Sequence, residues 1–157
     1  MKNAISVSWL DIKRAIDKIT NHLKSLTNET FVSVYGIPRG GLVPAVMLSH
    51  RLNIPLIIDP KIVRAHTISL TSRKIIIIDD ISDTGNTLFE FTSIYGRHNA
   101  YIITIHEHPK TVFKPDFSVF PKGKNWLVYP WEKNIKEYDL ITYDLITKSS
   151  TSPYKLG

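Results

Sequence analysis

The sequence predicts a doubly wound α/β fold, with a mostly parallel central sheet flanked by helices. Residues Ile75–Ile78 are four consecutive isoleucines, which is typical of a central parallel strand covered on both faces. Short apolar runs of this kind alternate with segments whose apolar residues recur at helical spacing. This alternation indicates βα units, so we expect one domain over residues 1–157.

The elements expected before residue 74 follow from local patterns. Ser8 can cap a helix that begins at Trp9, and Asp11 suits its first turn. The apolar side chains of this helix share one face: Trp9, Ile12, Ile16, Ile19, Leu23 and Leu26. We then expect a strand at residues 31–35, a loop at 36–41, a helix at 42–51 and a strand at 54–58. Residues 59–73 give no clear pattern.

The second half of the chain changes character after residue 108. We expect, in order, a strand at residues 74–78, a loop at 79–85, a helix at 86–96 and a strand at 101–105. Residues 109–132 contain several prolines and no clear periodicity, and we expect an irregular flap there, called the hood below. The core would then span about residues 5–108. The tail, residues 133–157, repeats five residues once at 138–147, which is too little for a solenoid.

Composition limits the classes of function. The net charge is +6, but the basic residues are spread along the chain, so we expect a polyanionic small substrate rather than nucleic acid. The chain has no cysteine, which excludes disulfides and thiolate chemistry. No apolar run approaches the roughly 20 residues of a membrane helix, and residues 1–3 do not begin an apolar signal sequence. We therefore expect a cytoplasmic protein with no membrane partner.

The segment that follows the four isoleucines carries the most chemical information. Asp79 and Asp80 end the expected strand, and the turn at residues 83–85 opens a helix. In open α/β sheets, ligands bind at the carboxyl ends of the strands. Main-chain N–H groups at such a helix N-terminus form a phosphate site, to which the hydroxyl groups of Thr84 and Thr87 add donors. The simplest alternative is that Asp79 and Asp80 only cap a helix and that Asp83 only stabilises the turn.

This segment closely resembles the phosphoribosyl pyrophosphate (PRPP) motif of type I phosphoribosyltransferases: an apolar strand, Asp-Asp, two residues, Asp-Thr-Gly, any residue and Thr. The resemblance implies that family's fold, with Asp79 and Asp80 binding the ribose hydroxyls or a hydrated Mg²⁺ ion as cofactor. It implies that Asp83 is catalytic, because it lies beside purine N7 in the family and can take or share its proton. It assigns PRPP binding to a loop made of Ser82, Asp83, Thr84, Gly85, Asn86 and Thr87.

Residues 35–44 look like the pyrophosphate loop of the same family. Gly40 and Gly41 let the main chain approach an anion closely, and the guanidinium group of Arg39 can pair with that anion. The resemblance also implies a cis peptide bond between Pro38 and Arg39.

Residues 125–132 are similar to the Trp-x-x-x-Pro-Trp-acidic stretch of bacterial xanthine-guanine phosphoribosyltransferases and their relatives. The similarity implies that Trp126 stacks on a purine and that main-chain groups of Leu127 and Val128 contact the edge of the base. We expect Trp131 to pack in the core instead. The resemblance covers roughly residues 5–132.

Two features of the sequence depart from the family: one residue and one loop. The family has a lysine before the proline that follows its fifth strand, where it contacts the exocyclic oxygen of the purine. Here that position is His108, whose imidazole can donate one hydrogen bond to a carbonyl oxygen, although it could also be only a strand-end residue. His106 shares strand spacing with His108, but no third ligand lies nearby in the sequence, so we do not expect a metal on the two histidines.

The second departure is the loop that closes over PRPP in this family. Only residues 59–73 are available for it, which makes a short lid. We expect Arg64 to contact the pyrophosphate, with Arg73 and Lys61 as alternatives. A short lid admits water and weakens electrostatic stabilisation, which leaves open a weak activity.

Together these resemblances imply a purine phosphoribosyltransferase that forms a homodimer or homotetramer and binds PRPP and a purine base. The expected acceptor is guanine, xanthine or hypoxanthine. Two alternatives stay open at this point. One is a regulatory protein of the same fold that senses PRPP or a nucleotide and binds RNA or a protein, which the basic charge and the short lid favour. The other is a phosphoribosyltransferase with a non-purine acceptor.

Overall fold

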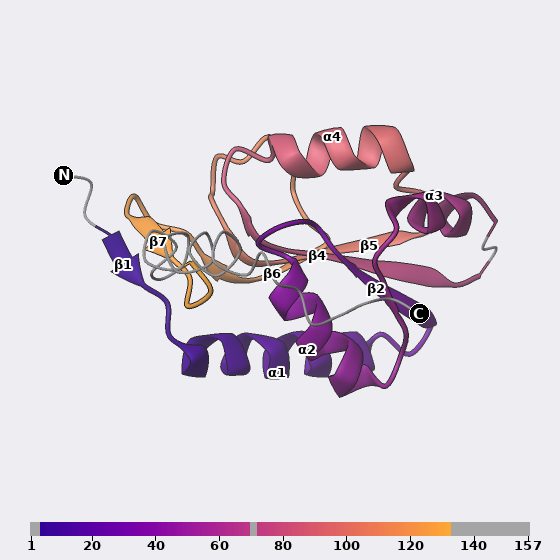
Figure 1. Ribbon diagram of the computed structural model, residues 1–157, viewed down its shortest axis with the longest axis horizontal. Coiled ribbons are helices and arrows are strands. Elements are labelled where there is room, and N and C mark those ends of the chain that lie inside the picture. Colours follow the sequence, from indigo (N-terminus) through magenta and orange to yellow (C-terminus); the bar gives the residue numbers. More distant parts are fainter. Residues whose placement is uncertain (1–3, 70–71, 133–157) are drawn as a thin grey trace, which may run out of the picture.

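The computed structural model describes residues 4–69 and 72–132, and it confirms the predicted α/β class (Figure 1). Five strands form a parallel sheet in the order β3-β2-β4-β5-β6. Their bounds are Phe31–Gly36 for β2, Leu56–Ile57 for β3, Lys74–Ser82 for β4, Ala100–Glu107 for β5 and Phe117–Pro121 for β6. The tail with its repeat at 138–147 lies outside the described residues.

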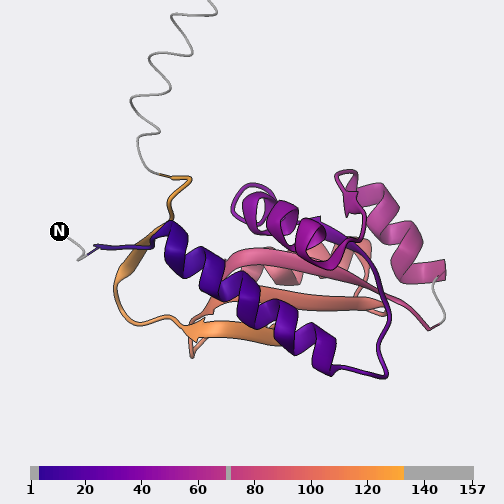
Figure 2. The same cartoon turned by 90° about the horizontal axis from the view of Figure 1, so that it is seen from below.

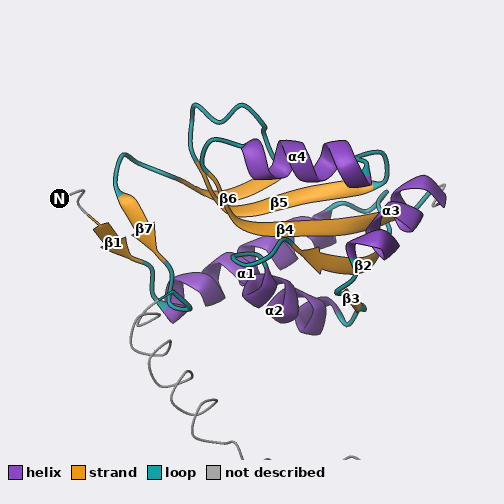
Figure 3. Cartoon of the chain, turned by 45° about the horizontal axis from the view of Figure 1, so that its top comes forward, coloured by secondary structure: helices purple, strands orange, loops and turns teal. Residues whose placement is uncertain are grey.

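Helices cover both faces of this sheet. Helices α1 (Trp9–Ser25) and α2 (Leu42–Leu52) lie on one face, and α3 (Pro60–Ser69) and α4 (Asn86–Tyr95) on the other (Figures 1 and 3). Helix α1 begins with a capping box: the hydroxyl oxygen of Ser8 accepts from the N–H of Asp11, and the Asp11 carboxylate accepts from the N–H of Ser8. Among the described helices, none is long and apolar enough to cross a membrane.

The four isoleucines of β4 explain why the sheet is covered twice. All four are completely buried. Ile76 and Ile78 pack with α1 and α2, whereas Ile75 and Ile77 pack with residues of α3 and α4. Successive side chains of a strand point to opposite faces, so one apolar run supplies both cores. The resulting rigid strand carries the two aspartates that follow it.

Strand β4 is longer than the sequence predicted. It continues through Asp79 and Asp80 to Ser82, because β5 extends beside it and pairs Asp79 with Thr104 and Ile81 with His106. The two aspartates are therefore held by a ladder of main-chain hydrogen bonds rather than by a loop.

The segment expected to be a lid is helical instead. Residues 60–69 form α3, which buries Val63 and Thr67 against the sheet and α4. The hydroxyl group of Thr67 donates to the main-chain oxygen of Tyr95 over 2.6 Å, so α3 is tied to the end of α4. The interpretation of residues 59–73 as a short closing loop is wrong for the residues that the structure describes.

The hood is also more regular than expected. Residues 117–121 form β6, which extends the main sheet beside β5 because Phe117 and Val119 pack against the core. Strand β7 (Trp126–Val128) pairs in parallel with β1 (Ala4–Ser6), a strand that the sequence did not reveal. Figure 2 shows this two-stranded sheet standing beyond one end of the main sheet.

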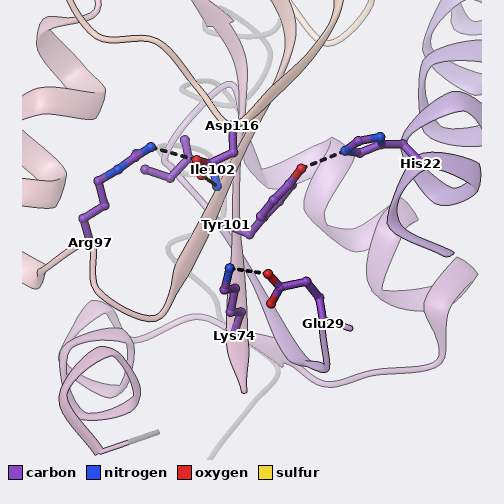
Figure 4. Close-up of polar contacts among 7 residues, drawn as sticks. All are labelled: His22, Glu29, Lys74, Arg97, Tyr101, Ile102 and Asp116. Atoms are coloured by element: carbon purple, nitrogen blue, oxygen red, sulfur yellow. Dashed lines mark hydrogen bonds and ion pairs between the residues drawn. The ribbon is translucent and has the colours of Figure 1, made fainter. Parts of the chain in front are cut away.

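Polar contacts brace the end of the sheet where β4, β5 and β6 begin (Figure 4). Lys74 donates to Glu29 over 2.6 Å, and the carboxylate of Asp116 accepts from the N–H of Ile102 over 2.7 Å. In addition, Asp116 accepts from Arg97 over 2.8 Å, and the hydroxyl group of Tyr101 lies 2.7 Å from the imidazole of His22. The opposite, carboxyl end of the strands carries the candidate site.

Candidate active site

A cavity of about 330 Å³ opens at the carboxyl end of β4, a volume typical of small-molecule sites. The end of β4, the loop after β2, the start of α4 and the hood line it. Most of the site residues expected from the sequence line this cavity: Arg39, Gly40, Asp79, Asp80, Ser82, Asp83, Thr84, Gly85, Thr87, Trp126 and Leu127. The loop after β2, the turn between β4 and α4, and the hood, which are far apart in the sequence, therefore meet at one place.

Two carboxyl groups are buried together at the floor of the cavity. Asp79 is 7% exposed and Asp80 is 8% exposed. Burial and the neighbouring charge of Asp80 raise the pKa of Asp79 well above its usual value. Burial and the negative charge of Glu132 raise the pKa of Asp80 to about 6. An acidic pair held at such electrostatic cost suits a cation or hydroxyl donors as its ligand.

The loop after β2 lies directly against this pair. The peptide bond between Pro38 and Arg39 is cis, as the resemblance implied. A Cβ atom at Gly40 would overlap the carboxyl group of Asp80, so only glycine lets the loop pack there. Gly41 does not line the cavity: a Cβ atom there would overlap the main-chain oxygen of Ile78. Gly41 therefore lets the loop approach β4 closely.

The turn between β4 and α4 is built for close main-chain approach. Gly85 has a φ of 89°, and a Cβ atom on it would lie 2.6 Å from the N atom of Phe113. It occupies the N-cap position of α4, where it offers no side chain to the first helical turn. Main-chain N–H groups at such a helix start are suited to bind a phosphate.

The hydroxyl group of Ser82 has a structural partner already. It lies 2.8 Å from the hydroxyl group of Thr111 and donates to the main-chain oxygen of Phe113 over 3.0 Å. Ser82 is 2% exposed, so these contacts anchor the turn to residues 111–113. Asn86 does not line the cavity, and its main-chain N–H donates to the Thr84 hydroxyl oxygen over 3.3 Å.

The hood closes the opposite wall of the cavity. Trp126 is 53% exposed and lines the cavity, so its ring is available for stacking. Leu127 lines the cavity too, whereas Val128 does not: its main-chain oxygen accepts from the N–H of Val7 over 2.9 Å. Trp131 packs as expected, stacked on Tyr129 with ring centroids 5.0 Å apart.

The cavity also contains a lysine that the sequence did not indicate. The side chain of Lys122 is only 9% exposed, and its Nζ atom lies 2.7 Å from a carboxylate oxygen of Asp83. Lys122 directly follows β6, and its N–H donates to the main-chain oxygen of Glu107 over 2.7 Å. Its place in the site depends on the pairing of β6 with β5, which no local pattern predicts.

Comparison with known proteins decides the family. The profile of the phosphoribosyl transferase domain family matches residues 7–140. The chain belongs to this family. This confirms the relationship that the motifs around Asp79 and Trp126 indicated.

Individual relatives of this phosphoribosyltransferase agree with that assignment. The chain is 24% identical over 144 residues to a xanthine-guanine phosphoribosyltransferase of Idiomarina loihiensis, covering 82% of this chain and 87% of the relative. It is 28% identical over 144 residues to one of Cereibacter sphaeroides, covering 80% and 85%. The structure is similar to that of a purine phosphoribosyltransferase of Pyrococcus horikoshii, with a TM-score of 0.64 and 29% identity, covering 83% of this chain and 95% of that chain.

Two expected site residues lie elsewhere in this phosphoribosyltransferase. Arg64 is exposed on α3 and does not line the cavity, because its segment is a packed helix rather than a lid. His108 does not line the cavity either. Its ring Nδ1 atom accepts from the main-chain N–H of Lys110 over 3.1 Å, and its main-chain N–H donates to the main-chain oxygen of Ser82. In this structure His108 lies directly after β5 and outside the cavity.

Proposed function

We propose that this phosphoribosyltransferase transfers the 5-phosphoribosyl group of PRPP to a 6-oxopurine and releases pyrophosphate. The observation that carries the proposal is the composition of one cavity: a buried acidic pair, an open helix start and an exposed indole ring. These three features match the ribose hydroxyls, the 5-phosphate and the flat base of the two substrates. The names of the curated relatives support the purine acceptor.

The ribose 5-phosphate would lie across β4 and the start of α4. The main-chain N–H groups of Thr84, Gly85 and Thr87 and the hydroxyl group of Thr87 would bind the phosphate. The carboxyl groups of Asp79 and Asp80 would accept hydrogen bonds from the ribose hydroxyls. Arg39, which lines the same cavity, would bind the pyrophosphate and stabilise the charge that develops on it.

Mg²⁺ is the cofactor that this function implies, and the residues present fit it. Asp79 and Asp80 supply oxygen ligands, and a divalent cation would offset the burial and the neighbouring negative charges that raise their pKa values. Within the described residues, no group of three or more His, Asp and Glu side chains forms a cage for a metal. Mg²⁺ in such sites is held by one or two carboxylates together with substrate oxygens. When bound, it would neutralise the leaving pyrophosphate.

The chemical step would need only one proton-accepting side chain. A ring nitrogen of the base attacks C1 of the ribose, and the bond from C1 to the pyrophosphate oxygen breaks, with its electron pair leaving on pyrophosphate. Asp83, at the edge of the cavity, would take or share the proton of the base as the new bond forms. Trp126 would hold the plane of the base by stacking.

The test is pyrophosphate release from PRPP in the presence of Mg²⁺ and one base at a time. Guanine, xanthine and hypoxanthine are expected to support release and to yield the matching nucleoside monophosphate, and adenine, uracil and orotate are not. Release with a pyrimidine alone would favour the non-purine acceptor. Tight PRPP binding without release for any base would favour the regulatory alternative, which the relatives do not support.

A further inference from the structure

Lys122 is the buried cation of the cavity, and the function proposed above gives it no task. Its side chain is 9% exposed, whereas Lys124, two residues further on, is exposed. Lysine is almost never buried unless it is paired, because removing an ammonium group from water is costly. The pairing with Asp83, at 2.7 Å, explains how the charge is tolerated.

The ion pair leaves donor capacity for a ligand. An ammonium group has three N–H donors. Within the described part of the chain, the structure gives the Nζ atom of Lys122 one acceptor, the Oδ2 atom of Asp83. The Asp83 side chain is 43% exposed and keeps a second carboxylate oxygen. The pair therefore presents donors and an acceptor side by side on the wall of the cavity.

The hydrogen-bonding pattern of this pair is complementary to one class of base. Trp126, Leu127 and Lys122 line the same cavity, so a base stacked on the indole ring has its edge within the compartment that holds the ion pair. A purine with oxygen at C6 presents an acceptor at C6 and, beside it, N7, whose proton can be donated to a carboxylate. A purine with an amino group at C6 presents donor hydrogens there instead, which an ammonium group cannot bind.

We propose that Lys122 is the specificity-determining residue that recognises the exocyclic oxygen at C6 of the acceptor, and that the Lys122–Asp83 pair selects 6-oxopurines over 6-aminopurines. This inference rests on the proposed function and refines it. It moves base recognition from the end of β5, where His108 bonds to Lys110, to the residue that follows β6. A contribution by Lys122 to folding alone is the competing explanation.

Base-binding isotherms and steady-state kinetics on three variants separate these explanations. Lys122→Met keeps the length of the buried side chain and removes its charge. Lys122→Arg keeps the charge. Lys124→Met is the control, because it removes a nearby exposed lysine. Hypoxanthine and adenine are the two probes, measured with PRPP and Mg²⁺ present, and the KM of PRPP reports on the remainder of the site.

In Lys122→Met, affinity and kcat/KM for hypoxanthine should fall about 10- to 100-fold, the range for a lost hydrogen bond to a charged group. Adenine binding should stay equal or improve, and the KM of PRPP should stay nearly constant. Lys122→Arg should retain the preference for hypoxanthine, and Lys124→Met should match the wild type. An equal loss for both bases, or no loss for hypoxanthine, would overturn the role of Lys122.

The two proposals fail in distinguishable ways. If the wild type binds hypoxanthine in preference to adenine and Lys122→Met abolishes that preference, Lys122 reads the base even when no pyrophosphate is released. In that case only the proposed activity is lost. If pyrophosphate is released with 6-oxopurines and the preference survives in Lys122→Met, the activity stands and the inference about Lys122 is wrong. If the wild type binds neither base, both are wrong.

Discussion

The hydroxyl group of Tyr129 donates a hydrogen bond to the main-chain oxygen of Asp80 over 2.9 Å and so joins the hood to the acidic end of β4. The same hydroxyl oxygen lies 2.9 Å from Nδ1 of His106, and because its one proton is already used, His106 is the donor there. The N–H of Tyr129 also donates to the carboxylate of Glu132 over 2.9 Å. Burial and the charge of Asp80 raise the pKa of Tyr129 well above its usual value, so the donor proton is retained.

Tyr129→Phe should therefore weaken both the fold and the site. The ring keeps its stacking on Trp131, but the buried oxygen of Asp80 and the Nδ1–H of His106 lose their partner. We expect a loss of about 1–3 kcal/mol in the free energy of unfolding by urea, and a lower kcat. Tyr95→Phe, on α4 away from the cavity, is the control. Equal stability of both variants would show that the hydrogen bonds of the Tyr129 hydroxyl group do not contribute measurably to stability.

Gly40→Ala should weaken PRPP binding, because the added Cβ atom would overlap the carboxyl group of Asp80. Either the loop or the aspartate must move, so we expect PRPP affinity to fall at least about tenfold, the effect of about 1.4 kcal/mol. Gly123→Ala is a matched control, since a Cβ atom at Gly123 meets nothing within 4 Å. Titration calorimetry with PRPP and Mg²⁺ measures the difference. Unchanged affinity in Gly40→Ala would mean that the close packing of loop and strand is not needed for binding.

Asp79→Ala/Asp80→Ala tests the acidic pair directly. Without the two carboxylates, the site loses the ligands expected for ribose hydroxyls and Mg²⁺. PRPP binding, measured by calorimetry with and without Mg²⁺, should become undetectable in the double variant and should depend on Mg²⁺ in the wild type. Glu90→Ala, which removes an exposed acid on α4, should bind as the wild type does. Wild-type affinity in the double variant would exclude the acidic pair from the PRPP site.

Local patterns predicted the parts of the fold that neighbouring residues determine. The capping box of Ser8 and Asp11 and the four isoleucines of β4 each depend on residues close in sequence. The motif after Ile78 placed the acidic pair and the helix start in one cavity, because a strand followed at once by a helix brings them together.

Long-range pairing accounts for what the sequence did not reveal. Strand β1 has only three residues, and its partner, β7, lies more than a hundred residues away, so no local signal marks it. Lys122 enters the cavity only because β6 adds to the edge of β5. Residues 60–69 lack a strong apolar periodicity, and their helix is stabilised by packing of Val63 and Thr67.

The raised pKa of Asp80 predicts a pH-dependent stability in the absence of ligands. The pKa of Asp80 is about 6 in the folded protein, against its ordinary value of 3.8, which applies to the unfolded chain. The folded protein therefore binds this proton more tightly than the unfolded chain does. The stabilisation of the fold by protonated Asp80 is complete below about pH 4 and is lost as the pH rises through about 6. The difference corresponds to about 3 kcal/mol as an upper bound, at about 1.4 kcal/mol per pKa unit.

Asp80→Asn should remove that contribution. The variant should be more stable than the wild type above about pH 6, and the difference should shrink or reverse near pH 4. Urea unfolding of metal-free protein at several pH values measures it, with Glu90→Gln as an exposed control. A constant difference between Asp80→Asn and the wild type at all pH values would mean that Asp80 titrates normally.

Asp83→Asn separates proton transfer from substrate binding. The substitution keeps the size of the side chain but removes the carboxylate that would accept the proton of the base and that pairs with Lys122. General-base catalysis contributes about 10²- to 10⁴-fold, so kcat should fall at least about tenfold even if solvent partly replaces the carboxylate. The KM of PRPP should change little, because the phosphate would be bound by main-chain N–H groups rather than by Asp83.

A control for Asp83→Asn must remove an ion pair without touching the cavity. Glu107→Gln does so, since Glu107 pairs with Lys114 over 3.4 Å and does not line the cavity. Its kcat should match that of the wild type. Single-turnover measurements with saturating PRPP and guanine would then isolate the chemical step in all three proteins. If Asp83→Asn turned over guanine at the wild-type rate, the base would lose its proton to another acceptor, and Asp83 would be left only as the partner that keeps the buried charge of Lys122 in place.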